Sequence, residues 1–372
     1  MQEQEQQRER EILHILEQAK RCGGSDIILT PGARVSVKVD GAVVPIADCA
    51  KCGGADESLR RALAPADTRR LLEAVYALGK RDPERAMGSG DDDFSFSVPR
   101  AGRFRCNAFK QRNSMAMVLR IVSFELPDPA LLGIPDSVMQ LAGVTKGLVL
   151  VTGPAGSGKS TTLACLIDRI NGTCRDHIIT IEDPIEFLHP HKKSVVTQRE
   201  VEHDTENYAS ALRAALRQAP DVILIGEMRD LTTIQTALTA AETGQLVLST
   251  LHTVGAAKTI DRIIDVFPAG QQQQIRVQLS MVLRAVVSQQ LLPRIDGGRA
   301  AAFEIMKANP AIQNMIRESK VHQMDNVIYA GADAGMRAMD ADILDLYRRG
   351  VISDQTALAY AVNPDLVAKK LA

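Results

Sequence analysis

The residues best suited to do chemistry form a glycine-rich stretch, GLVLVTGPAGSGKSTT, at positions 147–162. Its apolar run leads into a turn in which Gly153, Gly158, Lys159 and Ser160 fit the pattern G-x-x-x-x-G-K-[ST], the P-loop. Glycines let backbone N–H groups surround phosphate oxygens at a helix N-terminus, while the lysine suits the β- and γ-phosphates and the serine suits Mg²⁺. The stretch therefore predicts a nucleotide site. Its predicted contacts are Gly153, Pro154, Ala155, Gly156, Ser157, Gly158, Lys159, Ser160 and Thr161.

Carboxylates follow two more apolar runs. The run VILI ends two residues before Glu227, and ligands of open α/β sheets bind at the carboxyl ends of the strands. A glutamate there can polarise a water for attack on a γ-phosphate, which makes Glu227 the predicted catalytic base. Glu182, Asp183 and Glu186 follow the run at 178–181. One of them could bind Mg²⁺ through water or assist the base, and at least one is expected on a solvated acidic turn.

A histidine and a group of arginines are further candidates. His252 comes just past the apolar run Leu246–Thr250, where it could sense a γ-phosphate or serve as an ordinary structural histidine. Phosphoryl transfer needs cations on the γ-phosphate, often supplied by another domain or subunit. Arginines on predicted strands nearer the N-terminus could supply them, or could form a solvated sheet face. They are Arg103, Arg105, Arg112 and Arg120.

Two regions of different pattern must position these residues. Residues 1–124 predict a small α+β domain. Apolar residues at helical spacing predict helices at Arg8–Arg21 and 67–80, with a hairpin at 35–46 between them and three strands after the second helix. Residues 47–66 show no firm pattern, and we interpret them as a surface insertion.

Residues 125–135 are rich in proline and glycine, which suits an interdomain linker. Residues 136–372 then predict a RecA-like α/β domain whose parallel sheet is covered on both faces, because its strands are apolar without alternation. After Pro268 the chain is expected to be mostly helical. The predicted strands are Leu148–Thr152, Ile178–Ile181, Val222–Ile225 and Leu246–Thr250.

The composition of the 372 residues favours a globular protein and argues against several other classes. A net charge of −1 and 3% aromatic residues speak against a nucleic-acid binder. No apolar run approaches the length of a membrane span, and the polar start MQEQEQQRER cannot be a secretory signal, so we expect a cytoplasmic protein. The pair Cys49-x-x-Cys52 has ligand-like spacing, but structural zinc needs four ligands.

Together these residues resemble the type IV pilus retraction ATPases, the PilT group of secretion ATPases. The resemblance runs over nearly the whole chain. It is strongest at VTGPAGSGKSTTLA, TIEDPIEFLHPHKKSVVTQREV, PDVILIGEMRDLTTIQTALTAAETG and STLHT, and continues in AAKTIDRIIDVFPA and EIMKANPAIQNMIRESK. It implies a PAS-like N-terminal domain before the RecA-like motor, and a homohexamer that hydrolyses ATP with Mg²⁺. It also implies a peripheral position at the inner face of the cytoplasmic membrane, beneath a platform protein, driving pilin disassembly. A paralogous retraction ATPase is a further partner.

Roles carry over at matching positions. Lys159 and Ser160 match the Walker A site, Glu227 the Walker B glutamate, Glu186 the acidic residue of the "Asp box", and His252 the second histidine of the "His box". Glu186 is thereby the predicted acidic partner of Mg²⁺. The family's phosphate-facing arginines come from the segment that contains Arg105, Arg112 and Arg120.

The chain also departs from the family pattern. Gln245 stands where the first histidine of the His box is usual, and glutamine cannot carry a proton. Ala219 replaces the usual aspartate before a proline, and Gln313 the third residue of the marker helix AIRNLIRE.

Three other functions stay open. A pilus assembly or type II secretion ATPase would resemble this core but usually adds an N-terminal domain and a tetracysteine zinc element. The Gln245 change is compatible with a regulatory subunit that binds nucleotide without hydrolysing it, whereas the intact Lys159, Ser160 and Glu227 oppose that interpretation. A DNA-handling RecA-like ATPase would bind DNA in a salt-dependent way.

Overall fold

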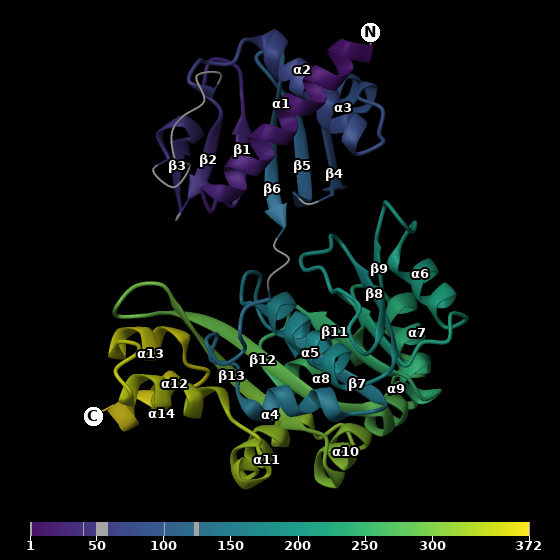
Figure 1. Cartoon of the computed structure of the whole chain (residues 1–372). Coiled ribbons are helices and arrows are strands. Elements are labelled where there is room, and N and C mark those ends of the chain that lie inside the picture. Colours follow the sequence, from purple (N-terminus) through teal and green to yellow (C-terminus); the bar gives the residue numbers. More distant parts are fainter. Residues whose placement is uncertain (1, 40, 50–58, 100, 123–125, 372) are drawn as a thin grey trace. The chain divides into compact units, whose positions relative to one another are not determined.

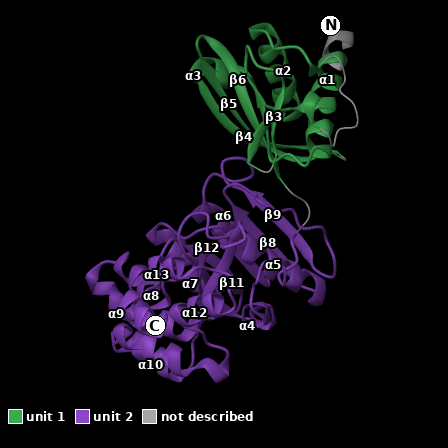
Figure 2. Ribbon diagram, turned by 90° about the vertical axis from the view of Figure 1, so that its left-hand side faces the viewer, with its two compact units in different colours: residues 1–124 green, residues 125–372 purple. Residues whose placement is uncertain are grey.

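The computed structural model describes residues 2–39, 41–49, 59–99, 101–122 and 126–371. The chain divides into two compact units, Met1–Phe124 and Glu125–Ala372 (Figure 2). Residues 126–135, predicted as a linker, lie within the second unit, where Ile134 is buried and the Cys165 thiol lies 3.7 Å from the carbonyl oxygen of Pro127.

Unit 1 is an α+β unit with one hydrophobic core. Its described strands form an antiparallel six-stranded sheet in the order β3-β2-β1-β6-β5-β4. Helices α1 and α2 lie over one face of this sheet (Figure 1), and Ile12 and Leu16 of α1 belong to the same hydrophobic core as Phe104 of β5. The bounds are α1 Gln2–Arg21, β1 Asp26–Leu29, β2 Ser36–Val39, β3 Ala42–Pro45, α2 Pro65–Leu78, α3 Glu84–Ser89, β4 Asp91–Val98, β5 Gly102–Gln111 and β6 Ser114–Val122.

The surface-insertion prediction for residues 47–66 is wrong at its C-terminal end. Leu59 and Leu63 are buried in the core of unit 1, and the backbone of Leu63 exchanges hydrogen bonds with Gly32 and Ala33. Cys49 is a half-buried free thiol, whereas Cys52 lies outside the described residues. Residues 59–63 therefore contribute to the core of unit 1.

Unit 2 is built on a seven-stranded sheet, counted over residues 126–371, in the order β13-β12-β7-β11-β10-β8-β9. Neighbouring strands run parallel except β13, which is antiparallel to β12. The strands are β7 Gly147–Thr152, β8 His177–Glu182, β9 Val195–Glu200, β10 Val222–Ile225, β11 Leu246–Leu251, β12 Leu283–Pro293 and β13 Arg299–Lys307.

Helices cover both faces of this sheet. α4 and α5 pack on the face that carries Val149 and Val151 of β7, whereas α6 to α10 pack on the face that carries Leu148 and Leu150. Because β7 is buried on both faces, it has no polar alternation, as the sequence predicts. The helices are α4 Asp136–Met139, α5 Lys159–Thr173, α6 Tyr208–Ala215, α7 Leu231–Glu242, α8 Ala256–Asp265, α9 Ala269–Val282, α10 Pro310–Arg317, α11 Met324–Ala330, α12 Met339–Arg348, α13 Asp354–Tyr360 and α14 Pro364–Leu371.

The expectation of a mostly helical chain after Pro268 is wrong for residues 283–307. Strand β12 begins at Leu283, directly after α9 ends at Val282, and pairs in parallel with β7, while β13 pairs with β12. With no glycine or proline between α9 and β12, the apolar spacing of the helix continues into the strand. β12 therefore lies beside the strand that leads into the P-loop.

Candidate active site

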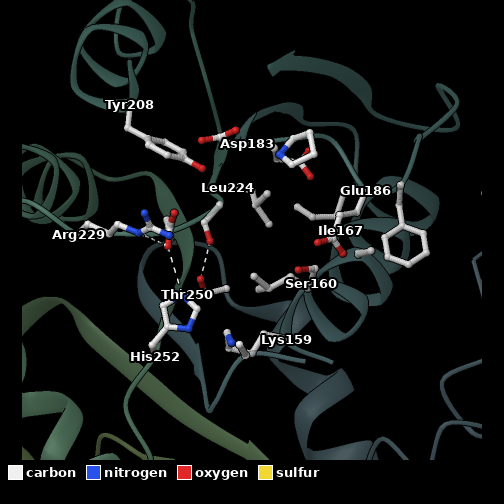
Figure 3. Close-up of a pocket in the computed structure, with 18 of the residues that line it drawn as sticks. Lys159, Ser160, Ile167, Asp183, Glu186, Tyr208, Leu224, Arg229, Thr250 and His252 are labelled. Carbon is white, nitrogen blue, oxygen red and sulfur yellow. Dashed lines mark hydrogen bonds and ion pairs between the residues drawn. The ribbon is translucent and has the colours of Figure 1, made fainter. Parts of the chain in front are cut away.

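Four parallel strands end at one pocket of unit 2. The P-loop follows β7, Glu182 ends β8, Glu227 follows β10, and His252 follows β11. Strand order β7-β11-β10-β8 places these carboxyl ends side by side, so residues far apart in sequence line a common cavity (Figure 3).

The loop at Gly153–Gly158 has the backbone shape that a phosphate cradle needs. Gly153, Gly156 and Gly158 have φ values of 141°, 74° and 88°, a region that favours glycine. Ala155, Gly156, Lys159 and Ser160 line the pocket. The remaining predicted contacts, Gly153, Pro154, Ser157, Gly158 and Thr161, belong to the same loop and to the first turn of α5.

Lys159 is bound to its own loop. Its Nζ donates hydrogen bonds to the carbonyl oxygens of Gly153 and Pro154, both at 2.9 Å, and the residue is 8% exposed. Burial lowers the pKa of the ammonium, and the negative charges of Glu227 and Glu186 partly offset this effect. One buried cation and two carboxylates therefore line the same pocket, which is the charge pattern expected around a bound triphosphate with a divalent cation.

Two buried hydroxyls at the P-loop lack a protein partner. Thr152 Oγ1, at the end of β7, and Ser157 Oγ, inside the loop, are buried without a hydrogen bond. A buried polar atom without a partner is costly, and a phosphate oxygen could accept from such a hydroxyl. Together with the glycine conformations, these unpaired groups fit a phosphate-bearing ligand.

Glu227 is held between two side chains. Its Oε2 atom lies 2.6 Å from Arg229 Nε and 3.3 Å from His252 Nε2. The side chain of Glu227 is 14% exposed, whereas those of Arg229 and His252 are 75% and 51% exposed. The predicted base and the predicted histidine are therefore in direct contact.

The three carboxylates after β8 differ in environment. Glu182 accepts hydrogen bonds from Thr180 Oγ1 at 2.6 Å and Gln198 Nε2 at 3.3 Å, and burial raises its pKa to about 7. Asp183 and Glu186 are exposed at the pocket wall, as expected for an acidic turn. Across the described residues, no group of three or more His, Cys, Asp or Glu side chains forms a ready metal cluster. Ser160 and Glu186 line the same pocket, and Mg²⁺ usually takes one or two protein ligands plus phosphate and water.

The candidate arginines lie in unit 1. Arg105 and Arg120 are directly opposite each other on β5 and β6, and they pair with carboxylates of the same unit. Arg105 lies 2.7 Å from Asp93, and Arg120 lies 2.8 Å from Asp26. Arg112 is exposed in the turn between β5 and β6, with a φ of 46°. Arg105 and Arg120 thus share one sheet with their carboxylate partners, and the role of all three arginines at a γ-phosphate stays a prediction.

Sequence reasoning missed three polar residues at this site. Arg229 follows the predicted base by two positions, a spacing that could have suggested a contact. His189 lines the pocket, where burial lowers its pKa to about 4. Gln289 contacts the P-loop from β12, a strand that the sequence did not indicate.

An α/β sheet with a P-loop after a central strand, and a glutamate after a strand two places away in the sheet, defines a RecA-like P-loop nucleotidase. The chain matches the family model described as "Type II/IV secretion system protein" over residues 2–334. It is 44% identical over 359 residues to the type IV pilus retraction ATPase PilT of Pseudomonas aeruginosa, covering 95% of this chain and 99% of the relative. It is 52% identical over 274 residues to a twitching motility protein of Neisseria gonorrhoeae, covering 73% of each chain.

A crystal structure of the pilus retraction motor PilT with bound ADP agrees with this chain at a TM-score of 0.85 and 44% identity, covering 96% of this chain and 98% of that one. The chain therefore belongs to the type II/IV secretion system family. Within it, the chain is a member of the PilT group, which confirms the resemblance seen in the sequence.

Proposed function

We propose that this chain is an ATP-hydrolysing motor that powers retraction of type IV pili. The observation that carries the proposal is the pocket lined by both the P-loop lysine and Glu227, in a chain similar over nearly its whole length to retraction ATPases. The two-unit chain, 1–124 followed by the linker 125–135 and the motor 136–372, is part of this proposal.

ATP is the proposed substrate, and Mg²⁺ is its proposed companion. The P-loop backbone and Lys159 would hold the β- and γ-phosphates, and Ser160 and Glu186 would hold Mg²⁺, which supplies charge neutralisation at the transferring phosphoryl group. The unpaired Ser157 hydroxyl supports a ligand at this position.

Glu227 is the proposed general base. It would take a proton from a water as the water oxygen bonds to the γ-phosphorus and the bond to the bridging oxygen of ADP breaks. Arg229 and His252 contact its carboxylate and so orient it. A proton accepted by Glu227 could pass to His252, whose ring nitrogen is 3.3 Å away.

The motor is proposed to act as a homohexamer in which Arg105, Arg112 or Arg120 adds positive charge at the γ-phosphate. These arginines belong to unit 1, whereas the P-loop belongs to unit 2. Hydrolysis in a unit 2 would therefore depend on the position of a unit 1. No described helix is long and apolar enough to cross a bilayer. The proposed partners are an inner-membrane platform protein, the pilin fibre through it, and a paralogous retraction ATPase.

Pilus retraction in living cells tests this proposal. We expect the gene to restore twitching motility to a bacterium that lacks its own retraction ATPase but retains its pili, and the Lys159→Ala variant to fail. Restored pilus assembly in an assembly-deficient strain, without restored retraction, would instead support an assembly or secretion ATPase. Wild-type rescue that survives Lys159→Ala would show that nucleotide use by this chain is dispensable and would support a regulatory subunit.

A further inference from the structure

Two adjacent residues of β12 contact the two loops that carry proposed site residues. Gln289 lies against the P-loop, and Ser288 binds the loop between His252 and α8, which we call the His252 loop. Ser288 is fully buried and pairs with Thr152, the last residue of β7 before the P-loop. Gln289 is 3% exposed and is the next residue along β12, beside Gly153. Successive side chains of a strand point to opposite faces, so the two residues reach different elements.

Gln289 packs closely against the P-loop and the first turn of α5. Its Oε1 accepts a hydrogen bond from the buried Thr162 hydroxyl of α5 at 2.7 Å. A methyl group added at Gly153 would lie 2.1 Å from the Gln289 carbonyl oxygen, and one added at Gly158 would lie 2.9 Å from the Gln289 amide nitrogen. Gln289 therefore lies close to both the first and the last glycine of the P-loop, and it is hydrogen-bonded to the first turn of α5.

Ser288 anchors the other loop. Its Oγ accepts a hydrogen bond at 2.9 Å from the backbone N–H of Gly255, the N-cap residue of α8. The next N–H, that of Ala256, donates to Glu304 Oε1 of β13 at 2.7 Å. Gly255 comes three residues after His252, whose ring contacts Glu227. Ser288 thus anchors the chain three residues past the histidine that contacts the proposed base.

We propose that Ser288 and Gln289 are positioning residues that hold the P-loop and the His252 loop in a fixed relation. The inference rests on the proposed hydrolysis at this site and names the residues that organise it. Gln289 prearranges the P-loop N–H groups, so it acts on nucleotide affinity. Ser288 arranges His252 and Glu227, so it acts on turnover.

Nucleotide affinity tests the Gln289 half without requiring turnover. Gln289→Leu and Thr162→Val each remove one side of the buried hydrogen bond, and we expect each to weaken Mg-ADP binding, measured by calorimetry, about three- to tenfold. Because the two variants break the same bond, the double variant should lose less than the product of the single losses. Thr162→Ser keeps the hydroxyl and should bind as the wild type does.

Gln290→Leu is the matched control, because it makes the same chemical change one residue further along, where the side chain faces Tyr360 instead. It should leave Mg-ADP binding unchanged. Unchanged affinity in both Gln289→Leu and Thr162→Val would overturn the assignment. Should Gln289→Leu fail to fold, the near-isosteric Thr162→Val variant decides the question alone.

The role proposed for Ser288 is tested by comparing the effect of its substitution on kcat with the effect on the Kd for Mg-ADP. We expect Ser288→Ala to lower kcat about tenfold or more while the Kd for Mg-ADP stays at the wild-type value, since displaced catalytic groups cost rate. Equal losses of kcat and affinity, or a lower melting temperature with both constants intact, would contradict the proposal. A wild-type protein that binds Mg-ADP but does not hydrolyse ATP would refute the proposed function and leave the Gln289 measurement readable.

Discussion

Replacing Glu182 by glutamine should stabilise the protein in a pH-dependent way. Burial raises the pKa of this carboxyl from 4.5 to about 7, despite hydrogen bonds from Thr180 and Gln198 that favour its ionised form. Each tenfold change in proton affinity corresponds to about 1.4 kcal/mol, so ionised Glu182 costs the folded state up to about 3 kcal/mol.

The direction in which stability changes with pH follows from the protons bound by the folded and unfolded states. Between pH 4.5 and about 7 the folded state holds this proton more tightly than the unfolded state, so stability falls as pH rises through that window and is constant above it. Glutamine is neutral throughout and keeps the carbonyl oxygen that accepts both hydrogen bonds. The variant should therefore exceed the wild type by up to about 3 kcal/mol at pH 8, and the difference should vanish near pH 4.5.

Urea unfolding of unit 2, followed by circular dichroism at several pH values between 4.5 and 8, measures this difference. Glu206→Gln is the matched control, because it removes the same charge from an exposed position of the same unit. A difference between Glu182→Gln and the wild type that is the same at every pH would refute the reasoning, because it would exclude a buried ionisation as the cause.

Three further changes follow from local geometry. Gly153→Ala should reduce Mg-ADP affinity more than a hundredfold by calorimetry, since its methyl group would lie 2.1 Å from a backbone oxygen, whereas Gly172→Ala on α5 meets nothing within 4 Å and should bind normally. Ala219→Gly should raise the unfolding free energy by about 1 kcal/mol, because Ala219 has a φ of 51°. Asp230→Ala should lower it by about 1 kcal/mol in the same urea assay, because Asp230 caps α7 through the N–H of Thr233 at 2.9 Å. An unaltered unfolding midpoint in either stability variant would contradict its local explanation.

The parallel strands that carry the site could be predicted because their chemistry is local in sequence. Each is a short apolar run followed closely by a predicted site residue, as in VILI, two residues before Glu227. A buried central strand shows no alternation of apolar and polar residues, because both of its faces are covered. A short apolar run followed by a glycine-rich turn therefore predicts such a strand. The same pattern underlies the predictions of the P-loop, the base and the acidic turn.

Strand β12 could not be predicted, and with it the role of Gln289 was missed. Its residues LRAVVSQQLLP continue the apolar spacing of α9, and no turn residue separates the two elements. The decision between helix and strand at Leu283 depends on the free edge of β7, a tertiary partner that lies more than 130 residues earlier in the chain. Local propensity is a weak guide wherever such a partner decides the outcome.

The position of Gln245 became informative only in three dimensions. It directly precedes β11, whereas His252 follows the other end of the same strand. Its Oε1 accepts a hydrogen bond from Thr243 at 2.9 Å. Since a strand of six residues spans about 20 Å, Gln245 lies far from the nucleotide pocket of its own chain. The replacement of a histidine there leaves the P-loop, Glu227 and His252 of this chain in place.

Steady-state hydrolysis of Mg-ATP, by the wild type beside its Glu227→Gln variant, tests the central claim most directly. We predict turnover by the wild type and a loss of at least about a hundredfold in the variant, with nucleotide affinity retained, since the change removes the proton acceptor and leaves the P-loop intact. Binding of ATP by both proteins with equal and negligible turnover would contradict the claim that this pocket is a motor's catalytic site.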